Sequence, residues 1–131
     1  MSALVLDAGA LIALDRDDRA VWAILRVAAD AGETVHVPAG VIAQAWRDGR
    51  RQVLLVRALR HCHEVSFDGR LARAVGLLCG QASTSDVVDA SVALAVAGAS
   101  RHDDVTLLTS DRADLRHLLS VLNVVARTVD V

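Results

Sequence analysis

The chain has 131 residues, of which 53% are apolar and 23% are charged, and its formal net charge at pH 7 is −2. This composition excludes a disordered chain, and the length predicts one domain. The apolar runs are too short for a membrane helix, and the charge balance lacks the basic character typical of nucleic-acid-binding domains.

The two cysteines, Cys62 and Cys79, form no C-x-x-C pattern. Their spacing fits neither a disulfide framework nor a zinc finger. The first apolar stretch ends at Asp7, which does not fit the apolar region of a secretory signal. We therefore expect a cytoplasmic protein with reduced thiols.

Short apolar runs alternate with helical patterns along the first half of the chain. A run such as residues 3–6, apolar without a break, is typical of a strand buried on both faces. Gly32 is suited to end the first long helix, and Pro38 to begin the next. The elements expected here are strands over 3–6 and 34–37, a helical turn over 9–14, and helices over 18–31, 39–46 and 50–60, with Trp46 facing inward.

The second half repeats this alternation. The run behind Asp86 is apolar nearly all round, which predicts a buried helix. The elements expected here are strands over 64–67, 105–109 and 123–129, and helices over 69–79, 86–99 and from 111 or 112 to about 119. Joined by right-handed crossovers, these elements predict an α/β fold, a three-layer α/β/α sandwich with a central, mainly parallel sheet of about five strands.

Several aspartates follow predicted strands or begin the buried helix. Asp7 comes directly after the first strand and Asp111 after the fourth, so both are expected at the edge of the sheet where ligands bind. Asp86 and Asp89 are three residues apart and share a helix face. The chain has no lysine, and no arginine lies near this pair in the sequence.

Carboxylates without Cys or His beside them are typical ligands of hard cations, so Mg²⁺ or Mn²⁺ fits them better than Zn²⁺. Such a site suits hydrolysis of a phosphodiester by a metal-activated water. Each aspartate alone has a simpler interpretation, as a helix cap or as a favourable charge at a helix N-terminus. From these residues alone, both interpretations stay open.

Four segments resemble the motifs of PIN domains. Residues 5–14, with Val-Leu-Asp at their start, resemble the opening motif, and residues 37–38 with the helix after them resemble the second. Residues 86–90 resemble the third motif, and residues 107–115 resemble the closing T-x-D motif. The order and spacing agree over essentially the whole chain. The sequence looks most like the VapC group, the toxin ribonucleases of bacterial toxin–antitoxin pairs, which implies one PIN-like domain over 1–131.

The resemblance implies an endoribonuclease that depends on Mg²⁺ or Mn²⁺ and cleaves RNA. Asp7, Asp89 and Asp111 would be the catalytic residues and metal ligands, and Asp86 would ligate the metal or support a ligand. Thr109 would orient a carboxylate through a hydrogen bond. The resemblance also implies a homodimer and a VapB-type antitoxin that blocks the site. No association with membranes is expected, because the apolar runs are too short for a membrane helix.

One position departs from the family pattern. The second motif usually offers a Glu on the helix after the second strand, and here that position is Gln44. Its amide can offer an oxygen but carries no charge and cannot act as a base. Gln44 is a supporting residue in the nuclease hypothesis. In the alternative hypothesis, it marks a catalytically weakened PIN-fold module that binds RNA or protein.

Basic residues outside the aspartate positions are further candidates for a role. Arg47, Arg50 and Arg51 would share a helix face and could contact the phosphates of RNA beside the site, although a solvated face is the simpler interpretation. His61 and His63 lack further ligands for zinc and are expected at the surface. A receiver-like phosphoryl-transfer domain also gathers aspartates at a sheet edge, but it needs a lysine that this chain lacks.

Overall fold

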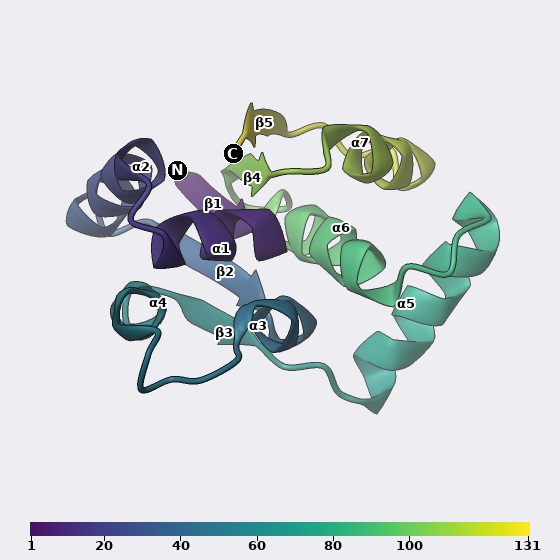
Figure 1. The fold of residues 1–131 in the computed structure, drawn as a ribbon. Coiled ribbons are helices and arrows are strands. Elements are labelled where there is room, and N and C mark those ends of the chain that lie inside the picture. Colours follow the sequence, from purple (N-terminus) through teal and green to yellow (C-terminus); the bar gives the residue numbers. More distant parts are fainter.

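The computed structural model describes residues 1–131 and contains one five-stranded sheet in the order β3-β2-β1-β4-β5 (Figure 1). Every neighbouring pair is parallel. The strands are β1 (Ser2–Leu6), β2 (Thr34–Pro38), β3 (His63–Val65), β4 (Asp104–Thr109) and β5 (Arg127–Asp130). The predicted α/β class and the number of strands are confirmed.

Seven helices connect and cover the strands. They are α1 (Ala8–Asp15), α2 (Arg19–Asp30), α3 (Ala39–Ala45), α4 (Val53–Leu59), α5 (Gly69–Ala82), α6 (Val87–Ala99) and α7 (Arg112–Val121). Right-handed crossovers place α1 to α4 on one face of the sheet and α5 to α7 on the other. The packing agrees, because α1 contacts α2, α3 and α4, whereas α6 contacts α5 and α7. The predicted three-layer sandwich is therefore confirmed. None of these helices has the length and apolar character needed to span a bilayer.

The central strands are buried because their apolar residues serve both layers. In β1 and β4, Val5 lies opposite Leu107 and Leu6 opposite Leu108, and all four side chains are fully buried. The helix expected to be buried is α6, whose side chains from Ala90 to Val96 include five buried residues. This central helix fixes the position of its own N-terminus at the carboxyl edge of the sheet.

The chain reverses its direction of travel through the sheet between β1 and β4. Strands β2 and β3 lie on one side of β1, and β4 and β5 lie on the other. The carboxyl ends of strands at such a reversal leave a crevice in which ligands of parallel α/β proteins bind. The backbone N–H of Asp7 donates to the carbonyl of Leu108 at 3.1 Å, which extends the pairing of β1 and β4 up to this crevice.

The helix expected over 50–60 is wrong in its first part. Residues Arg47 to Gln52 form a loop, and α4 begins only at Val53. The Gln52 side chain explains the loop, since its Oε1 accepts from the N–H groups of Arg47 and Asp48 at 2.7 and 2.9 Å. Its Nε2 donates to Asp15 on α1 at 3.1 Å. The expectation that Arg47, Arg50 and Arg51 share a helix face is therefore also wrong.

Trp46 does not face inward as predicted, because 42% of it is exposed. It ends α3, and the loop turns back over its ring. A Cβ atom on Gly49 would lie 2.5 Å from Cζ2 of Trp46, so the loop can approach the ring only because that residue is glycine. Smaller shifts concern strand and helix ends: β3 starts one residue earlier than expected, β5 starts at Arg127, and α5 extends to Ala82.

Candidate functional site

Asp7 directly follows the carboxyl end of β1 beside β4, and its side chain is buried. Its Oδ1 accepts a hydrogen bond from the N–H of Ala10 at 3.0 Å and so caps α1. Its Oδ2 accepts from the Thr109 hydroxyl and from the N–H of Ser110, the latter at 3.2 Å. Each carboxylate oxygen has two lone pairs. Oδ2 is therefore fully used, whereas Oδ1 keeps one position for another partner.

Thr109 joins Asp7 to the start of α7. Its buried hydroxyl donates to Asp7 and accepts from the N–H of Asp111 at 2.8 Å. Gly9 allows the neighbouring backbone to come close, because a Cβ there would lie 2.2 Å from Oγ and 2.5 Å from Cβ of Ser110. These contacts hold the ends of β1 and β4 in one fixed arrangement.

Asp89, Asp111 and Asp114 form what we call the acidic cluster. One carboxylate oxygen from each lies within 4.8 Å of the other two. Asp89 stands in the first turn of α6, and Asp114 in the first turn of α7 behind Asp111. The positive ends of two helix dipoles therefore meet at the cluster, which favours negative charge there.

The negative charge of the acidic cluster is not neutralised by the chain itself, since neither of the two ion pairs in the structure involves it. Burial raises the pKa of Asp89 from 3.8 to about 7, and the charges of Asp86, Asp111, Asp114 and Asp7 add to the rise. Burial also raises the pKa of Asp111, with a further contribution from Asp114. Mutual repulsion of this kind is relieved by a bound cation.

A hollow of about 240 Å³ opens beside the acidic cluster, between the end of α5 and α7. Asp86, Asp89 and Asp114 line its acidic side. The Oδ1 of Asp86 caps α6 by accepting from the N–H of Asp89 at 2.9 Å. On the other side, Nε2 of His117 lies 2.9 Å from the carbonyl oxygen of Ala82, which ties α7 to the end of α5.

The four predicted aspartates and Gln44 separate into three groups. Asp89 and Asp111 are brought together in the acidic cluster. Asp7 and Asp86 lie close enough for their charges to act on Asp89, but each is engaged as a helix cap. Gln44 lies exposed on α3, makes no side-chain hydrogen bond and takes no part in the acidic cluster.

The three arginines predicted to contact RNA lie in the loop before α4. The Arg47 guanidinium donates to the carbonyl of Trp46 at 2.7 Å and also to that of Ala43. Arg51 lies 3.7 Å from a carboxylate oxygen of Asp48. Of the three guanidinium groups, only that of Arg50 has no partner within the chain.

Asp114 is the member of the acidic cluster that was not predicted. The sequence contained a signal for it, because Asp114 follows Asp111 at the same spacing at which Asp89 follows Asp86. In both cases an aspartate at the start of a helix is followed by another one turn later. The fold places these two helix starts side by side.

The donor set fits a hard divalent cation. Three carboxylates with oxygens so close together repel one another, and no nitrogen or sulfur ligand lies among them. Mg²⁺ and Mn²⁺ bind oxygen ligands of this kind, usually through a few carboxylates together with water. Asp89, Asp111 and Asp114 could hold such an ion, and Asp7 could contribute the free lone pair of its Oδ1.

Comparison with solved structures identifies the fold. A chain in the crystal structure of VapBC2 from Rickettsia felis, bound to a DNA fragment from their promoter, matches with a TM-score of 0.65 at 14% sequence identity, over 100% of this chain and 99% of that one. This is a PIN-like fold. A chain in the structure of FitAB bound to the IR36 DNA fragment matches with a TM-score of 0.61 at 17% identity, over 97% and 94% of the two chains.

The PIN-like fold is shared without clear similarity in sequence. No protein-family model matches this chain, and no curated protein matches it significantly. The PIN-like fold explains why the carboxylates meet at the end of β1 and β4, but a fold alone does not establish an activity. The activity has to be argued from the acidic cluster and its surroundings.

Proposed function

We propose that this protein is a metal-dependent endoribonuclease of the VapC type, with Mg²⁺ or Mn²⁺ as its cofactor. The observation that carries the proposal is the acidic cluster, three close carboxylates without a cationic partner at the ligand-binding edge of a PIN-like fold. A polyanionic substrate would be repelled by this cluster unless a cation were bound there. Phosphodiester hydrolysis is the reaction that best uses such a combination.

Each residue of the site has a role in this proposal. Asp89, Asp111 and Asp114 would hold the ion, and Asp7 would support it from the end of β1. Such an ion, when bound, would supply an activated water and neutralise charge that develops on the phosphate. Thr109 keeps Asp7 in place through the hydrogen bond that it donates. The same hydroxyl accepts from the N–H of Asp111 and so holds the start of α7 next to Asp7.

The proposal includes an antitoxin as the partner that controls this activity, and a homodimer as the working form. The antitoxin is supported by the structures with the same fold, whose names describe the complexes VapBC2 and FitAB. The resemblance of the sequence motifs to the VapC group points to the same kind of partner. The homodimer rests only on the resemblance of the sequence to the VapC group. A protein partner that covers the acidic cluster would block access of RNA to it.

The proposal is tested by incubating the purified protein with tRNA and rRNA in Mg²⁺, in Mn²⁺ or in EDTA. We expect discrete products that require the metal. Asp89→Asn and Asp114→Asn should each lower the rate by about 100-fold or more, because each removes a charge and a ligand oxygen from the acidic cluster. Asp30→Asn is the matched control, since this exposed residue ends α2 on the opposite face of the sheet.

Two results would count against the nuclease. One is cleavage by Asp89→Asn at the wild-type rate, and the other is cleavage that persists in EDTA. Folded protein that binds RNA without cutting it, with or without metal, would support the alternative of a catalytically weakened binding module. In that case Gln44→Glu, which restores the carboxylate of the second motif, is the next variant to assay.

A further inference from the structure

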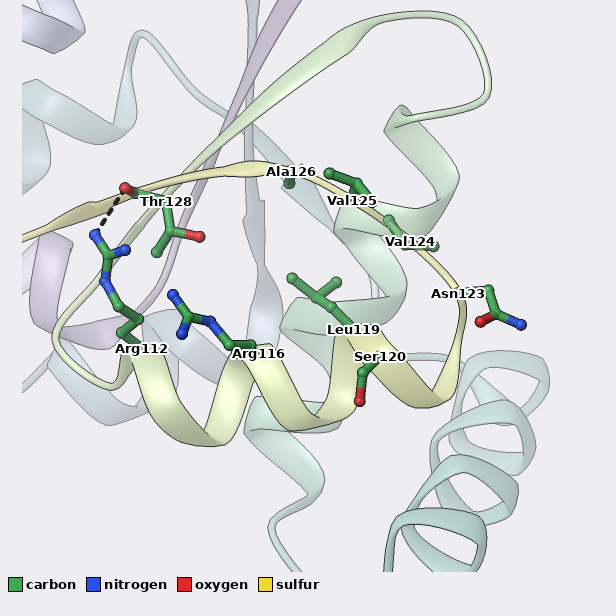
Figure 2. A pocket seen from close by; sticks show the side chains of 9 residues that line it. All are labelled: Arg112, Arg116, Leu119, Ser120, Asn123, Val124, Val125, Ala126 and Thr128. Carbon is green, nitrogen blue, oxygen red and sulfur yellow. Dashed lines mark hydrogen bonds between the residues drawn. The ribbon is translucent and has the colours of Figure 1, made fainter.

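A groove runs between α7 and β5, beside the acidic cluster but separate from the hollow described above. Its volume is about 480 Å³, within the range of roughly 300–1,000 Å³ typical of ligand sites. Figure 2 shows Arg112 and Arg116 on the side of α7 that faces β5, with Leu119 farther along the same helix. Val124 and Val125 border the far end.

The two arginines differ in the partners they already have. Arg112 donates from Nε to Asp130 at 2.9 Å. It also donates from a terminal nitrogen to the carbonyl of Thr128 at 2.9 Å, the bond drawn in Figure 2. Arg116 is exposed and takes part in no hydrogen bond or ion pair of the structure. The groove therefore contains one guanidinium whose donors are all available, and such a group is suited to bind phosphate.

The position of Arg116 relates this cation to the acidic cluster. Arg112 directly follows Asp111 in the chain, and Arg116 lies one helical turn farther along α7. Asp114, between them, lines the acidic hollow on another side of the same helix. The same helix thus carries Asp114 toward the hollow and the two guanidinium groups toward β5, and Arg112 joins the groove to Asp111 through the backbone.

We propose that this groove binds the RNA strand next to the nucleotide that is cut, with Arg116 as the contact to a backbone phosphate. The inference rests on the proposed function. The acidic cluster repels every phosphate except one that shares its metal ion, so neighbouring phosphates need a cation outside the cluster. Arg116 is a free cation on α7, which carries Asp114 and begins directly after Asp111.

The occupant is an RNA strand and not an added peptide strand for a structural reason. A peptide that extends the sheet at β5 would need the free backbone groups of that edge. The carbonyl of Thr128 in this short strand is already bonded to Arg112, whose side chain protects the edge. The groove also contains no aromatic side chain for base stacking, so RNA binding there depends mainly on charge.

The test is a binding assay on the full chain that carries Asp89→Asn, so that RNA is bound without being cut. The probe is a fluorescently labelled single-stranded RNA of about twelve nucleotides, titrated in Mg²⁺ at several salt concentrations. We expect Arg116→Ala to weaken binding about 5- to 10-fold and to reduce the slope of log K against log salt by about 0.7, the value for one phosphate contact on a single strand.

Two further variants separate charge from structure. Arg116→Lys keeps the cation and should retain most of the wild-type salt slope. Arg19→Ala, an exposed arginine at the start of α2 on the other face, removes the same charge away from the groove and should change neither affinity nor slope. Because the Arg116 side chain is exposed and has no partner, thermal unfolding of Arg116→Ala should match that of its parent.

The outcomes distinguish a failure of the groove proposal from a failure of the proposed nuclease function. If the Asp89→Asn parent and its Arg116→Ala variant bind RNA with equal affinity and equal salt slope, the proposed RNA contact in the groove is refuted, even if the wild-type protein cuts RNA. A wild-type protein that neither cuts nor binds RNA in any metal would refute the proposed function, and the inference with it. A loss of affinity without a change in slope would also refute the phosphate contact, because it would indicate only a change in shape.

Discussion

The raised pKa of Asp89 predicts an unusual effect of neutralising this residue. In the metal-free protein, Asp89→Asn should be more stable than the wild type at pH 8. The carboxylate is forced to ionise next to its acidic neighbours in the folded state, whereas in the unfolded chain it ionises freely. The amide has the same shape and never carries this charge.

The sign and size follow from the two pKa values. The pKa of Asp89 is raised from 3.8 to about 7 on folding, so its stabilising contribution is complete below about pH 4 and is lost as the pH rises through 7. A shift of about 3 units corresponds to roughly 4 kcal/mol. Because Asp89 is only partly buried, solvent screening reduces this to about 1–2 kcal/mol. In a domain of this size, that is about 3–8 °C in Tm.

The assay is thermal unfolding in EDTA at about pH 5 and pH 8, for the wild type and Asp89→Asn side by side. The comparison cancels the contributions of other titrating groups to the pH dependence of stability. His36 is one of them: its pKa is lowered by burial and by His63, so its contribution to stability increases with pH, whereas that of Asp89 decreases. Added Mg²⁺ should raise the Tm of the wild type at pH 8 and have little effect on the Tm of the variant. Equal pH dependence of the two proteins would refute the argument.

Three other results are expected. Mg²⁺ affinity, measured by calorimetry, should fall by up to about tenfold per pH unit below pH 7, because the ion displaces a proton from the acidic cluster; a flat profile would contradict the raised pKa values. Gly9→Ala should lower RNA cleavage in a folded protein, since the added Cβ displaces Ser110, whereas Gly76→Ala, with nothing within 4 Å, should keep full activity and raise the Tm. Thr109→Val should lower the free energy of unfolding in urea by about 1–3 kcal/mol, because it removes one of the three donors to the buried Asp7 carboxylate, and Thr109→Ser should recover most of the loss; a valine variant as stable as the wild type would show that the hydroxyl is dispensable.

Much of the fold could be predicted because it depends on local patterns. Strands β1 and β4 are buried on both faces, so their sequences are continuous apolar runs, and Asp18 and Gly32 mark the two ends of α2 by capping and by a positive φ of 71°. The loop before α4 could not be predicted from its neighbours in sequence. It depends on Gln52, whose side chain bonds to Asp15, a residue 37 positions away.

The candidate site divides in the same way. The edge of the sheet and the aspartates near it follow from the strand order, and Asp89 and Asp111 were predicted to lie there. The inclusion of Asp114 depends on the relative rotation of α6 and α7, which no local pattern encodes. The hydrogen bonds of Asp7 could not be predicted either, because two of its three donors come from β4 and the residue after it.

The hydrogen bond between Thr109 and Asp7 joins residues that are 102 positions apart. During synthesis, Asp7 leaves the ribosome long before its partner, and β1 has no neighbour in β4 until most of the chain has been made. The acidic cluster is also completed late, because two of its members, Asp111 and Asp114, come after β4. A growing or truncated chain that lacks β4 and α7 therefore carries some of the carboxylates but cannot form the acidic cluster. The activity that we propose would arise only when the last third of the protein has folded against the first strand.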